Sequence, residues 1–335
     1  MKILIIQTAF VGDIALSIFF ANELKQNFSD CEITFVSTEI GCEILKCFKF
    51  IDQPIAFSKR NKHKGLKGIN ILANKLNNVE YDYIFALHRS FRTAILVNKI
   101  KGKQKIGFDK NSLSFLLDKK IKYDKFIHEV KRNRKCLSVF STIKEEFDYL
   151  KCIEKNISDF DFITNVADDN FKKPILIAPG SVWETKKWDK NYFVELSNKL
   201  KQDNENIYLI GGKEDIGICN YIAERSGVQN LSGQTTIPQI LELVRNSKLV
   251  ITNDSAPTHF ASLFNIPTIT IYGPTSSKFG FYPLSEGSIF IEDEDLFCSP
   301  CSIHGEKKCP RKTMQCMKNI TPEMVYAMLN TLVAK

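Results

Sequence analysis

The sequence lacks several features that would place it in particular classes of protein. No apolar run approaches the roughly 20 residues of a membrane-spanning helix, and the short run at residues 3–8 is too brief for the apolar core of a secretory signal. The three glycines of a dinucleotide-binding turn are also missing, because only Gly12 is present in the first such loop, which argues against a nicotinamide oxidoreductase. We therefore expect a cytoplasmic protein whose ten cysteines are reduced thiols.

What the sequence does contain fits a folded protein of two domains. Its 335 residues suggest two domains at roughly 150 residues each, and 44% hydrophobic with 25% charged residues is ordinary for a globular chain. The net charge of +8 is unevenly placed, because lysine and arginine gather at residues 59–67, 99–110 and 119–135. Such stretches favour phosphates, nucleic acid or an acidic membrane face as partners, or they are simply a solvated surface.

Strand-like and helix-like segments alternate along the chain in two series. The first series predicts strands at residues 2–7, 32–36 and 83–87 and helices at 12–27, 40–48 and 91–100. The second predicts strands at 174–178, 207–210, 249–252 and 268–272 and helices at 191–202, 215–225, 237–246 and 257–264. This alternation indicates an α/β protein with two Rossmann-like, doubly wound domains, each built on a parallel sheet.

The boundary between the two domains is expected in the polar segment 164–173, which gives domains of residues 1–168 and 169–335. A final helix from Pro322 could pack on the second domain or back on the first. Ligands of open parallel sheets bind beyond the carboxyl ends of the strands, so we expect the two domains to face a central cleft.

The first candidate site lies where the opening strand passes into a helix. Gly12 allows a close approach of the backbone, and the helix N-terminus attracts an anion. Asp13 falls in the first helical turn, where an acid either complements the helix dipole as a cap or serves as a catalytic group. The spacing alone leaves both roles open.

The segment 179–188 leaves the first strand of the second series in the same way. Ser181 offers a hydroxyl group, and Lys186 and Lys187 offer ammonium groups, so the loop could cradle phosphate oxygens. Its two tryptophans, the only two in the chain, could instead pack at the base of the loop, and the two lysines could be solvated. The joint position of these residues favours the phosphate-binding role.

A third candidate is the segment 252–259, again at a junction between a strand and a helix. Asp254 or Ser255 can cap the helix, and the hydroxyls of Ser255 and Thr258 join its free N–H groups in an anion site. His259 lies about one turn in, where a histidine is either a core or capping residue or a functional one.

A fourth candidate follows the glycines at residues 211–212. The carboxylate of Glu214, or that of its neighbour Asp215, could accept hydrogen bonds from ribose hydroxyls. The alternative is a turn followed by the acidic start of a helix.

Four cysteines near the C-terminus form the last candidate. Cys298 and Cys301 have the spacing of a zinc-binding pair, and Cys309 and Cys316 follow, with His304 as a substitute ligand. The second pair is more widely spaced than zinc sites usually require. Reduced structural thiols, a zinc site and a disulfide are therefore all open interpretations.

Together these motifs resemble glycosyltransferase family 9, the lipopolysaccharide heptosyltransferases, over nearly the whole chain. The resemblance lies in the order and spacing of short segments, at residues 1–6, 12–13, 88–94, 106–108, 128–133, 179–188, 253–259 and 272–275. The cysteine segments at 298–301 and 309–310 resemble the heptosyltransferase II subgroup in particular. One departure is Ala256-Pro257, where the family commonly has a glycine.

The resemblance implies the GT-B architecture, an ADP-heptose donor and inversion at the anomeric carbon, with no cofactor and no essential metal. It assigns the general base to Asp13. It assigns the donor phosphates to Lys186 and to the helix start at Asp254 and Ser255. The ribose-binding acid of the family matches Glu214 most nearly.

The predicted site therefore has three sets of residues. The catalytic residues are Asp13 and Lys186; the donor-binding residues are Ser181, Lys187, Glu214, Asp254, Ser255, Thr258 and His259; the acceptor-binding residues are Gly12, Arg60, Lys64, Arg89, Arg92 and Arg132. The implied reaction moves a heptose to the inner core of lipopolysaccharide or lipooligosaccharide, an anionic glycolipid. It implies peripheral contact with the cytosolic face of the inner membrane and no binding of nucleic acid. Two alternatives stay open: transfer of another nucleotide-activated sugar, or a non-catalytic nucleotide- or nucleic-acid-binding protein.

Overall fold

The structure of the protein is a computed structural model that describes residues 1–143, 146–158, 160 and 173–333. The chain divides into two compact units, Met1–Phe162 and Ile163–Lys335, and each is described by itself. The domain boundary predicted between residues 168 and 169 lies outside the described residues, so the limits 1–168 and 169–335 stay predictions. Among the described residues, no helix has the length and apolar character needed to cross a membrane.

The first unit is built on a six-stranded parallel sheet in the order β3-β2-β1-β4-β5-β6. Strand β1 lies in the middle, where Ile3 pairs with Ile33 on one side and Tyr83 on the other. The strands are β1 (Lys2–Ile6), β2 (Glu32–Ser37), β3 (Gln53–Ala56), β4 (Tyr81–Ala86), β5 (Gly102–Phe108) and β6 (Lys119–Ile121). This order is that of a Rossmann fold, so the loops after β1 and β4 flank the point where the strand order reverses.

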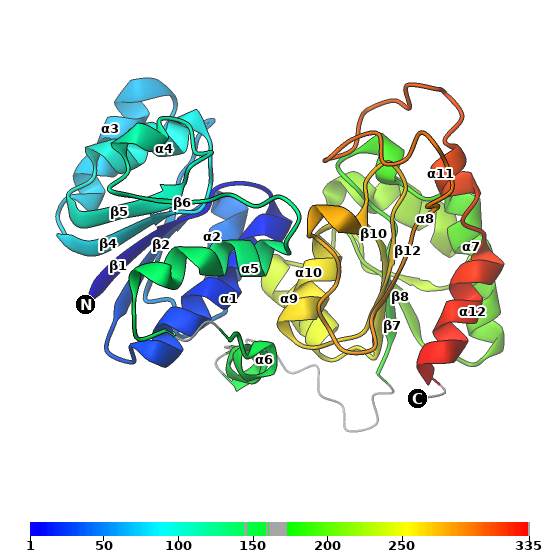
Figure 1. The fold of residues 1–335 in the computed structure, drawn as a ribbon. Helices are drawn as coiled ribbons and strands as arrows, with labels where there is room; N and C mark the ends of the chain where they lie inside the picture. Colours follow the sequence, from blue (N-terminus) through cyan, green and yellow to red (C-terminus); the bar gives the residue numbers. More distant parts are fainter. Residues whose placement is uncertain (144–145, 159, 161–172, 334–335) are drawn as a thin grey trace. The chain divides into compact units, whose positions relative to one another are not determined.

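Helices cover both faces of this sheet, as Figure 1 shows. They are α1 (Val11–Asn27), α2 (Glu39–Leu45), α3 (Gly65–Leu76), α4 (Phe91–Lys99), α5 (Glu129–Arg134) and α6 (Tyr149–Ser158). Helices α3 and α4 pack together, and Leu4 and Ile6 of β1 join Leu72 and Leu96 of these two helices in one core. Helix α1 contacts α2, α5 and α6, which explains why every residue from Ile14 to Leu24 is buried.

The second unit repeats the design with a six-stranded parallel sheet in the order β12-β11-β10-β7-β8-β9. Strand β10 pairs with β7 through Val250 and Leu176 and with β11 through Val250 and Thr268. The strands are β7 (Ile175–Ala178), β8 (Ile207–Leu209), β9 (Gln229–Asn230), β10 (Leu249–Asn253), β11 (Thr268–Ile271) and β12 (Ile289–Ile291). The two doubly wound parallel sheets confirm the predicted fold class.

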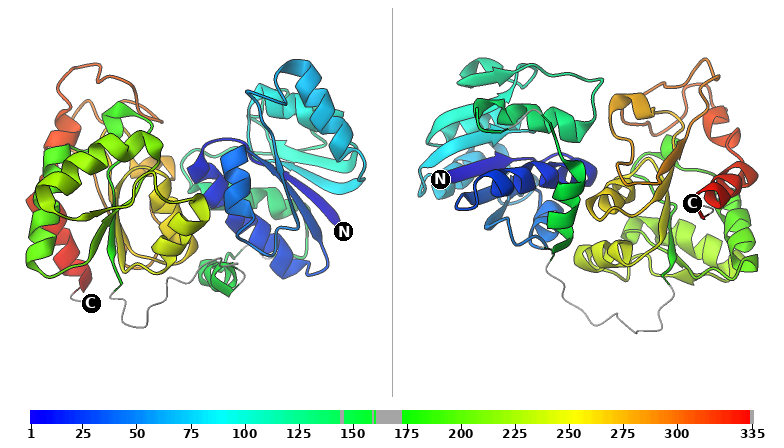
Figure 2. Two further views of the ribbon diagram at one scale, coloured as in Figure 1. Left: turned by 180° about the vertical axis from the view of Figure 1, so that it is seen from behind. Right: turned by 60° about the horizontal axis from the view of Figure 1, so that its bottom comes forward.

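The helices of the second unit are α7 (Lys190–Gln202), α8 (Ile216–Ser226), α9 (Ile237–Arg245), α10 (Ala256–Leu263), α11 (Gln315–Lys318) and α12 (Pro322–Val333). The final helix α12 packs against α7 and β11, and Figure 2 shows it (red) beside α7. Val325 and Leu329 of α12 belong to the same core as Phe193 and Leu196 of α7. Of the two positions predicted for this helix, the structure therefore shows packing on the second unit.

Candidate active site

Asp13 lies in the first turn of α1, directly after the loop that follows β1. Its carboxylate accepts hydrogen bonds from the backbone N–H groups of Phe10 and of Asp13 itself, and the side chain is partly exposed. These hydrogen bonds are those of an acid that caps a helix N-terminus. The capping role is therefore present, and it does not exclude a second role for this partly exposed residue.

The surroundings of Asp13 favour its protonated form. Burial raises the pKa of Asp13 to about 7, and the negative charge of Glu129 adds to this rise. The two backbone hydrogen bonds and the guanidinium of Arg132 act in the opposite direction. A carboxylate that exchanges its proton near neutral pH is suited to act as a general base there.

Arg132 is a buried residue of α5 and contacts other parts of the same unit. Its guanidinium pairs with Glu129, donates from Nε to the carbonyl oxygen of Asp124 at 2.7 Å and donates from Nη2 to that of Ile127 at 2.8 Å. It also lies 4.8 Å from the ring centroid of Tyr123. Only 1% of the surface of Arg132 is exposed. This residue was predicted to bind the acceptor, but the structure buries it where an acceptor does not reach it.

The other predicted acceptor residues are exposed. Arg60 and Lys64 lie in the turns before α3, and Arg92 lies in the first turn of α4. Arg89 precedes α4, and its guanidinium stacks on the ring of Tyr123 at 4.0 Å from the centroid. Gly12 is partly exposed next to Asp13.

The sequence did not single out Lys59, whose side chain contacts the loop before Asp13. Its Nζ donates to the carbonyl oxygen of Thr8 at 2.8 Å. Burial lowers the pKa of Lys59 to about 8, and the nearby charge of Arg92 lowers it further. Lys59 belongs to the basic stretch 59–67, but nothing in the sequence indicates which lysine of that stretch turns inward.

His88 fixes the same loop from the end of β4. Its Nδ1 atom is 2.7 Å from the hydroxyl of Thr8 and 3.1 Å from that of Thr93. Burial lowers the pKa of His88 to about 4, helped by the charges of Lys59 and Arg89. His88 is therefore neutral at physiological pH and holds the loop through hydrogen bonds instead of charge.

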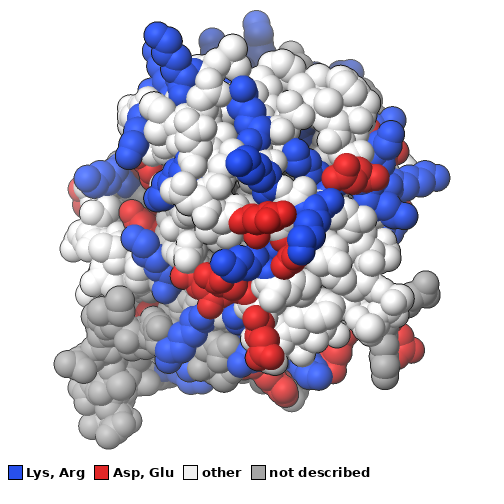
Figure 3. Space-filling model, turned by 90° about the vertical axis from the view of Figure 1, so that its left-hand side faces the viewer, with Lys and Arg blue, Asp and Glu red and all other residues white. Residues whose placement is uncertain are grey.

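The basic stretches of the first half do not form an unbroken cationic surface. Figure 3 shows blue lysine and arginine side chains spread over one face with red acidic side chains between them. Lys103 pairs with Asp82 at 2.7 Å, and Lys135 pairs with Asp124 at 3.4 Å. Much of the positive charge is thus an ordinary solvated surface.

In the second unit, Lys186 ends the short 3-10 helix η3 (Glu184–Lys186) that follows β7. Its Nζ forms an ion pair with Oδ2 of Asp254 at 2.6 Å, and both side chains are largely buried. Asp254 also accepts a hydrogen bond from the hydroxyl of Thr275 at 2.7 Å. Two residues predicted for donor binding, 68 positions apart in the sequence, are thereby brought together.

A second set of hydrogen bonds fixes the Lys186 loop on the sheet. The backbone N–H of Trp188 donates to Oδ1 of Asn253 at 3.1 Å, and Nδ2 of Asn253 donates to the carbonyl oxygen of Pro179 at 2.8 Å. The buried Trp188 ring donates from Nε1 to the carbonyl oxygen of Ile320 at 2.7 Å. Trp188 therefore packs at the loop base, as the alternative interpretation of the tryptophans expected.

The start of α10 places its predicted residues in different directions. Ser255 is the N-cap residue, and its partly exposed hydroxyl is 3.0 Å from that of Thr252. Thr258 is fully buried, and its hydroxyl is 3.1 Å from that of Thr270 on β11, so this side chain contacts the sheet. Its backbone N–H also bonds within the turn, to the carbonyl oxygen of Ser255.

His259 is 5% exposed and lies near the Lys186–Asp254 pair. Burial lowers the pKa of His259 to about 4, with Asp254 raising it and Lys186 lowering it. Within the described part of the chain, its Nδ1 atom has no hydrogen-bond partner. His259 is therefore a neutral imidazole at the base of the anion site.

The two acids that follow β8, Glu214 and Asp215, have different surroundings. Asp215 accepts a hydrogen bond from the N–H of Gly212 at 3.0 Å, and burial raises its pKa. A Cβ atom at Gly180 would lie 2.1 Å from Oδ1 of Asp215, so glycine is required for these loops to meet. Glu214 is exposed beside it. Glu214 is thus the more accessible of the two carboxylates.

The remaining donor residues have local contacts. The hydroxyl of Ser181 accepts a hydrogen bond from the N–H of Trp183 at 3.3 Å. Lys187 pairs with Glu184, which is largely exposed. The side chain of Lys187 is therefore more exposed than that of Lys186, and its partner Glu184 is exposed as well.

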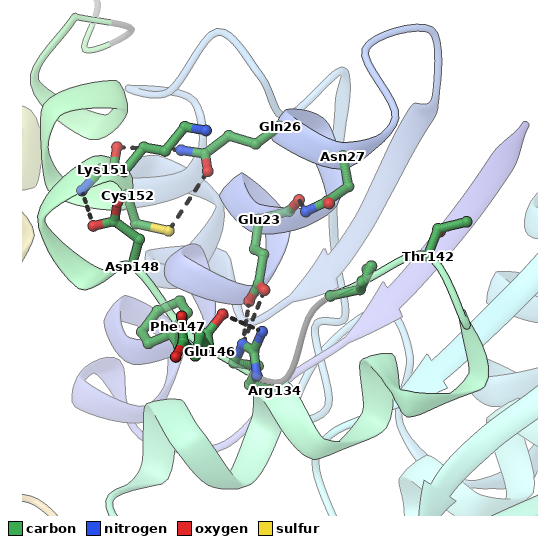
Figure 4. A pocket seen from close by; sticks show the side chains of 11 residues that line it. Glu23, Gln26, Asn27, Arg134, Thr142, Glu146, Phe147, Asp148, Lys151 and Cys152 are labelled. Carbon is green, nitrogen blue, oxygen red and sulfur yellow. Dashed lines mark hydrogen bonds and ion pairs between the residues drawn. The ribbon is translucent and has the colours of Figure 1, made fainter.

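The first unit also contains a cavity of about 710 Å³ that includes none of the predicted residues. Figure 4 shows it between α1, α6 and the segment after α5, with Glu23 and Arg134 pointing toward each other. Nε of Arg134 is 2.9 Å from Oε1 of Glu23, and this pair ties the last turn of α5 to α1.

All ten cysteines are free thiols in the structure. Cys316 packs in the core of the second unit, and burial raises its pKa to about 11. Cys309 accepts hydrogen bonds from the backbone N–H groups of residues 311–314, which lower its pKa. The thiol of Cys309 is therefore the more easily ionised of the two.

Solved structures are similar to this chain over its whole length. The crystal structure of a family 9 glycosyl transferase from Veillonella parvula has a TM-score of 0.83 at 19% identity and covers 99% of this chain and 97% of its own. The Escherichia coli heptosyltransferase WaaC with ADP has a TM-score of 0.78 at 17% identity and covers 99% and 100%. These likenesses confirm the predicted GT-B fold.

Sequence relatives point to the same family. Lipooligosaccharide heptosyltransferase 2 of Campylobacter jejuni is 28% identical over 99% of this chain and 98% of its own length. The protein of that name from Haemophilus influenzae is 25% identical over the whole of both chains. The predicted resemblance to the second heptosyltransferase group is thereby confirmed. The model of glycosyltransferase family 9 (heptosyltransferase) matches residues 69–311, which is well over half of the sequence, and the chain belongs to this family of glycosyltransferases.

Proposed function

We propose that the protein transfers a heptose from ADP-heptose to the inner core of lipopolysaccharide or lipooligosaccharide, with inversion at the anomeric carbon. The observation that carries this proposal is the environment of Asp13, a partly exposed residue in the first turn of α1, where burial of its carboxyl group raises the pKa to about 7. The names of the relatives support heptose as the sugar, and one related structure contains ADP.

The donor is held by the second unit. Lys186 offers an ammonium group and the N-terminus of α10 offers the N–H of Ala256 to the two phosphates, and Ser255 adds a hydroxyl. Lys187, Ser181 and His259 line the surroundings of this anion site. Glu214 accepts hydrogen bonds from the ribose, because its carboxylate is exposed whereas that of Asp215 is bonded to the backbone.

The reaction is a single displacement. An acceptor hydroxyl attacks the anomeric carbon while Asp13 takes its proton, and the bond from that carbon to the phosphate oxygen of ADP breaks. The leaving diphosphate gains negative charge, which Lys186 and the N–H of Ala256 at the start of α10 stabilise. Because the charge is met by fixed protein groups, the scheme requires no metal ion.

The acceptor is held by the first unit. Lys59 and Arg92 lie beside the loop that leads to Asp13, and Arg89 is oriented by the ring of Tyr123. These cations suit an acceptor that carries carboxylate or phosphate groups, with Arg60 and Lys64 at the periphery. The reaction takes place in the cytoplasm, and exposed lysine and arginine side chains of this unit make peripheral contact with the anionic inner membrane.

The direct test is to measure protection against thermal unfolding by ADP-heptose, UDP-sugars and GDP-sugars, followed by mass spectrometry of an inner-core acceptor incubated with the protective donor. We expect ADP-heptose to raise the melting temperature most and to add the mass of one heptose. Protection and transfer with another nucleotide sugar would show that heptose is not the sugar transferred. Protection by RNA or DNA without any transfer would contradict the proposed enzyme and indicate a nucleic-acid-binding protein.

A further inference from the structure

A second cavity of the first unit adjoins the one in Figure 4, and Arg134 and Phe147 line both. Its volume is about 640 Å³, within the range usual for sites that hold one small ligand. It is formed by the end of β6, the segment that leads to α5, helix α5 itself and the 3-10 helix η2 (Lys135–Val139) that follows. Of the residues described around it, none was predicted to bind the donor or the acceptor except through the general charge of this half.

Apolar side chains from separate segments form much of the cavity wall. Ile121 ends β6, Ile127 comes shortly before α5, Leu137 lies in η2, and Phe147 comes shortly before α6. Ile121 and Leu137 are buried, whereas Ile127 and Phe147 are partly exposed, so the wall runs from the core to the surface. Apolar surface in contact with water is unfavourable, and a concave apolar wall of this kind is typical of a ligand site.

The charged side chains that line this cavity are all basic, and they are Lys122, Lys131, Arg134 and Lys135. Arg134 is neutralised by Glu23 at 2.9 Å, and Lys135 has an exposed and therefore weak ion pair with Asp124 at 3.4 Å. Lys122 and Lys131 are exposed, and within the described part of the chain neither has an acidic partner. These two lysines therefore offer their charge to a ligand.

The neighbouring cavity in Figure 4 provides a contrast. Three carboxylates line it, those of Glu23, Glu146 and Asp148. Negative charge in that cavity repels an anion, whereas the lysines of the second cavity attract one. An anionic ligand is therefore favoured only in the second cavity.

The segment between β6 and α5 also presents an aromatic side chain to solvent. Phe126 is next to Ile127 in the sequence and is 75% exposed, and Nζ of Lys125 lies 4.9 Å from its ring centroid. Aromatic rings together with lysines are typical of surfaces at the boundary between membrane and water, where the ring enters the headgroup region and the ammonium group stays in water. The segment beside the cavity therefore has the composition of a membrane-contacting surface.

We propose that this cavity binds one anionic membrane lipid, with the headgroup phosphate near Lys122 and Lys131 and part of an acyl chain against the apolar wall. A nucleic acid would use the cations and leave the wall exposed, and a neutral lipid would use the wall and leave the cations unpaired. An anionic lipid uses both. The proposal rests on the membrane contact of the proposed function, for which it gives the place, and it is independent of the reaction at Asp13.

The first test measures flotation of the protein with vesicles of phosphatidylglycerol and phosphatidylcholine in equal amounts. Lys122→Ala combined with Lys131→Ala removes two charges from the cavity, and the control, Lys67→Ala combined with Lys75→Ala, removes two exposed charges from α3. Each lysine near an anionic surface contributes about fivefold, so the cavity variant should bind about 30-fold more weakly. The control should lose much less. Equal losses would show diffuse attraction by surface charge and overturn the proposal.

The second test asks whether the acyl chain enters the cavity. Ser138 lies in η2, lines the cavity and is exposed, so Ser138→Trp adds a large ring to the wall and leaves every charge in place. Calorimetry with monomeric lysophosphatidylglycerol should show one site in the wild type and much weaker binding in this variant, with an unchanged melting temperature. Glycerol phosphate has no chain and should bind weakly to both. Unchanged binding in Ser138→Trp, or equally tight binding of glycerol phosphate, would overturn the proposal.

Transfer of heptose to an acceptor without acyl chains tests the proposed function separately. Transfer by a wild-type protein that binds neither the vesicles nor the single-chain lipid would contradict the lipid site and leave the reaction standing. Lipid binding by a protein that transfers no sugar would contradict the reaction and leave the lipid site standing.

Discussion

Each unit places an acid just beyond a central strand of its parallel sheet and gives it different surroundings. Asp13 follows β1, whereas Asp254 follows β10, which neighbours β7 as β4 neighbours β1. Burial and the negative charge of Glu129 act on Asp13, whereas Asp254 pairs with Lys186 at 2.6 Å. A place beyond a central strand therefore does not determine what a carboxylate does, and its local surroundings do.

Under the proposed function, this difference gives each unit one half of the group transfer. An acid that is buried and lies near negative charge holds a proton more tightly and can take one from a hydroxyl group. An acid paired with a lysine orients that ammonium group near a helix N-terminus, where anions are favoured. Each of the following predictions tests the role of one of these acids or of a residue near it.

The largest effect is expected from Asp13→Asn. Because the amide cannot accept the proton of the acceptor hydroxyl, kcat should fall roughly 10²- to 10⁴-fold, the usual contribution of a general base. Single-turnover transfer of heptose to the acceptor measures this loss. Unchanged binding of ADP by calorimetry serves as the control, because the donor-binding residues are all in the other unit. Turnover close to wild type would remove Asp13 as the base.

A loss of about 10²- to 10³-fold in kcat is expected from Lys186→Ala, by comparison with the removal of one donor at an oxyanion site. The matched control is Lys187→Ala, since Lys187 pairs with the exposed Glu184 and not with the buried Asp254. We expect the second variant to retain most of the activity. Equal losses in both variants would mean that burial of the Lys186–Asp254 pair has no catalytic significance.

The pH dependence of the wild type should show the raised pKa of Asp13 in activity and in stability. Below pH 7, kcat/KM should fall about tenfold per pH unit as Asp13 becomes protonated. Between about pH 4 and 7 the folded state holds a proton that the unfolded chain has released, so the free energy of unfolding should fall as the pH rises through this window.

Asp13→Asn carries no such proton and is the control for this stability effect. The melting temperature of the variant minus that of the wild type should therefore be larger at pH 8 than at pH 5, as measured by calorimetry in matched buffers. A difference that does not depend on pH would show that Asp13 titrates near its ordinary value.

The smallest effect on ligand binding is expected from Glu214→Ala, which is compared with Asp215→Ala. Glu214→Ala removes an exposed carboxylate, so it should weaken ADP binding by about 1 kcal/mol, the net value of one hydrogen bond, and leave the melting temperature unchanged. Asp215→Ala removes the partner of the Gly212 N–H, so it should lower the melting temperature. Calorimetry of ADP binding with thermal unfolding of both variants distinguishes the two. The reverse pattern would assign the ribose to Asp215.

The central strands and most of the helices could be predicted from the sequence, because continuous apolar runs and helical spacing reflect burial directly. Strands β3, β5 and β6 of the first sheet and β9 and β12 of the second were missed, and they lie toward the sheet edges. Helices α3 and α6 were missed as well. Polar residues fill the first half of β5, and β6 has two lysines in its three residues, so neither shows a buried pattern. Helix α5 has six residues, which is too short to show a period.

The sequence indicates the loops of the candidate site more readily than the direction in which their side chains point. Lys186 and Asp254 were both named, and the structure pairs them. Thr258 was expected in the anion site, but the phase of α10 directs its hydroxyl to Thr270 of the sheet. Lys59 was not named at all, because a run of basic residues does not show which one turns inward. Such choices depend on tertiary packing.

The ion pair between Lys186 and Asp254 has a consequence for inhibitors of this protein. Any anion that binds Lys186 must share the ammonium group with a carboxylate that already neutralises it and that Thr275 also holds in place. A purely anionic mimic of a diphosphate therefore meets electrostatic competition from the Asp254 carboxylate. A zwitterionic compound, with an acidic group for the lysine and a hydrogen-bond donor for the aspartate, would extend the pair instead of competing with it.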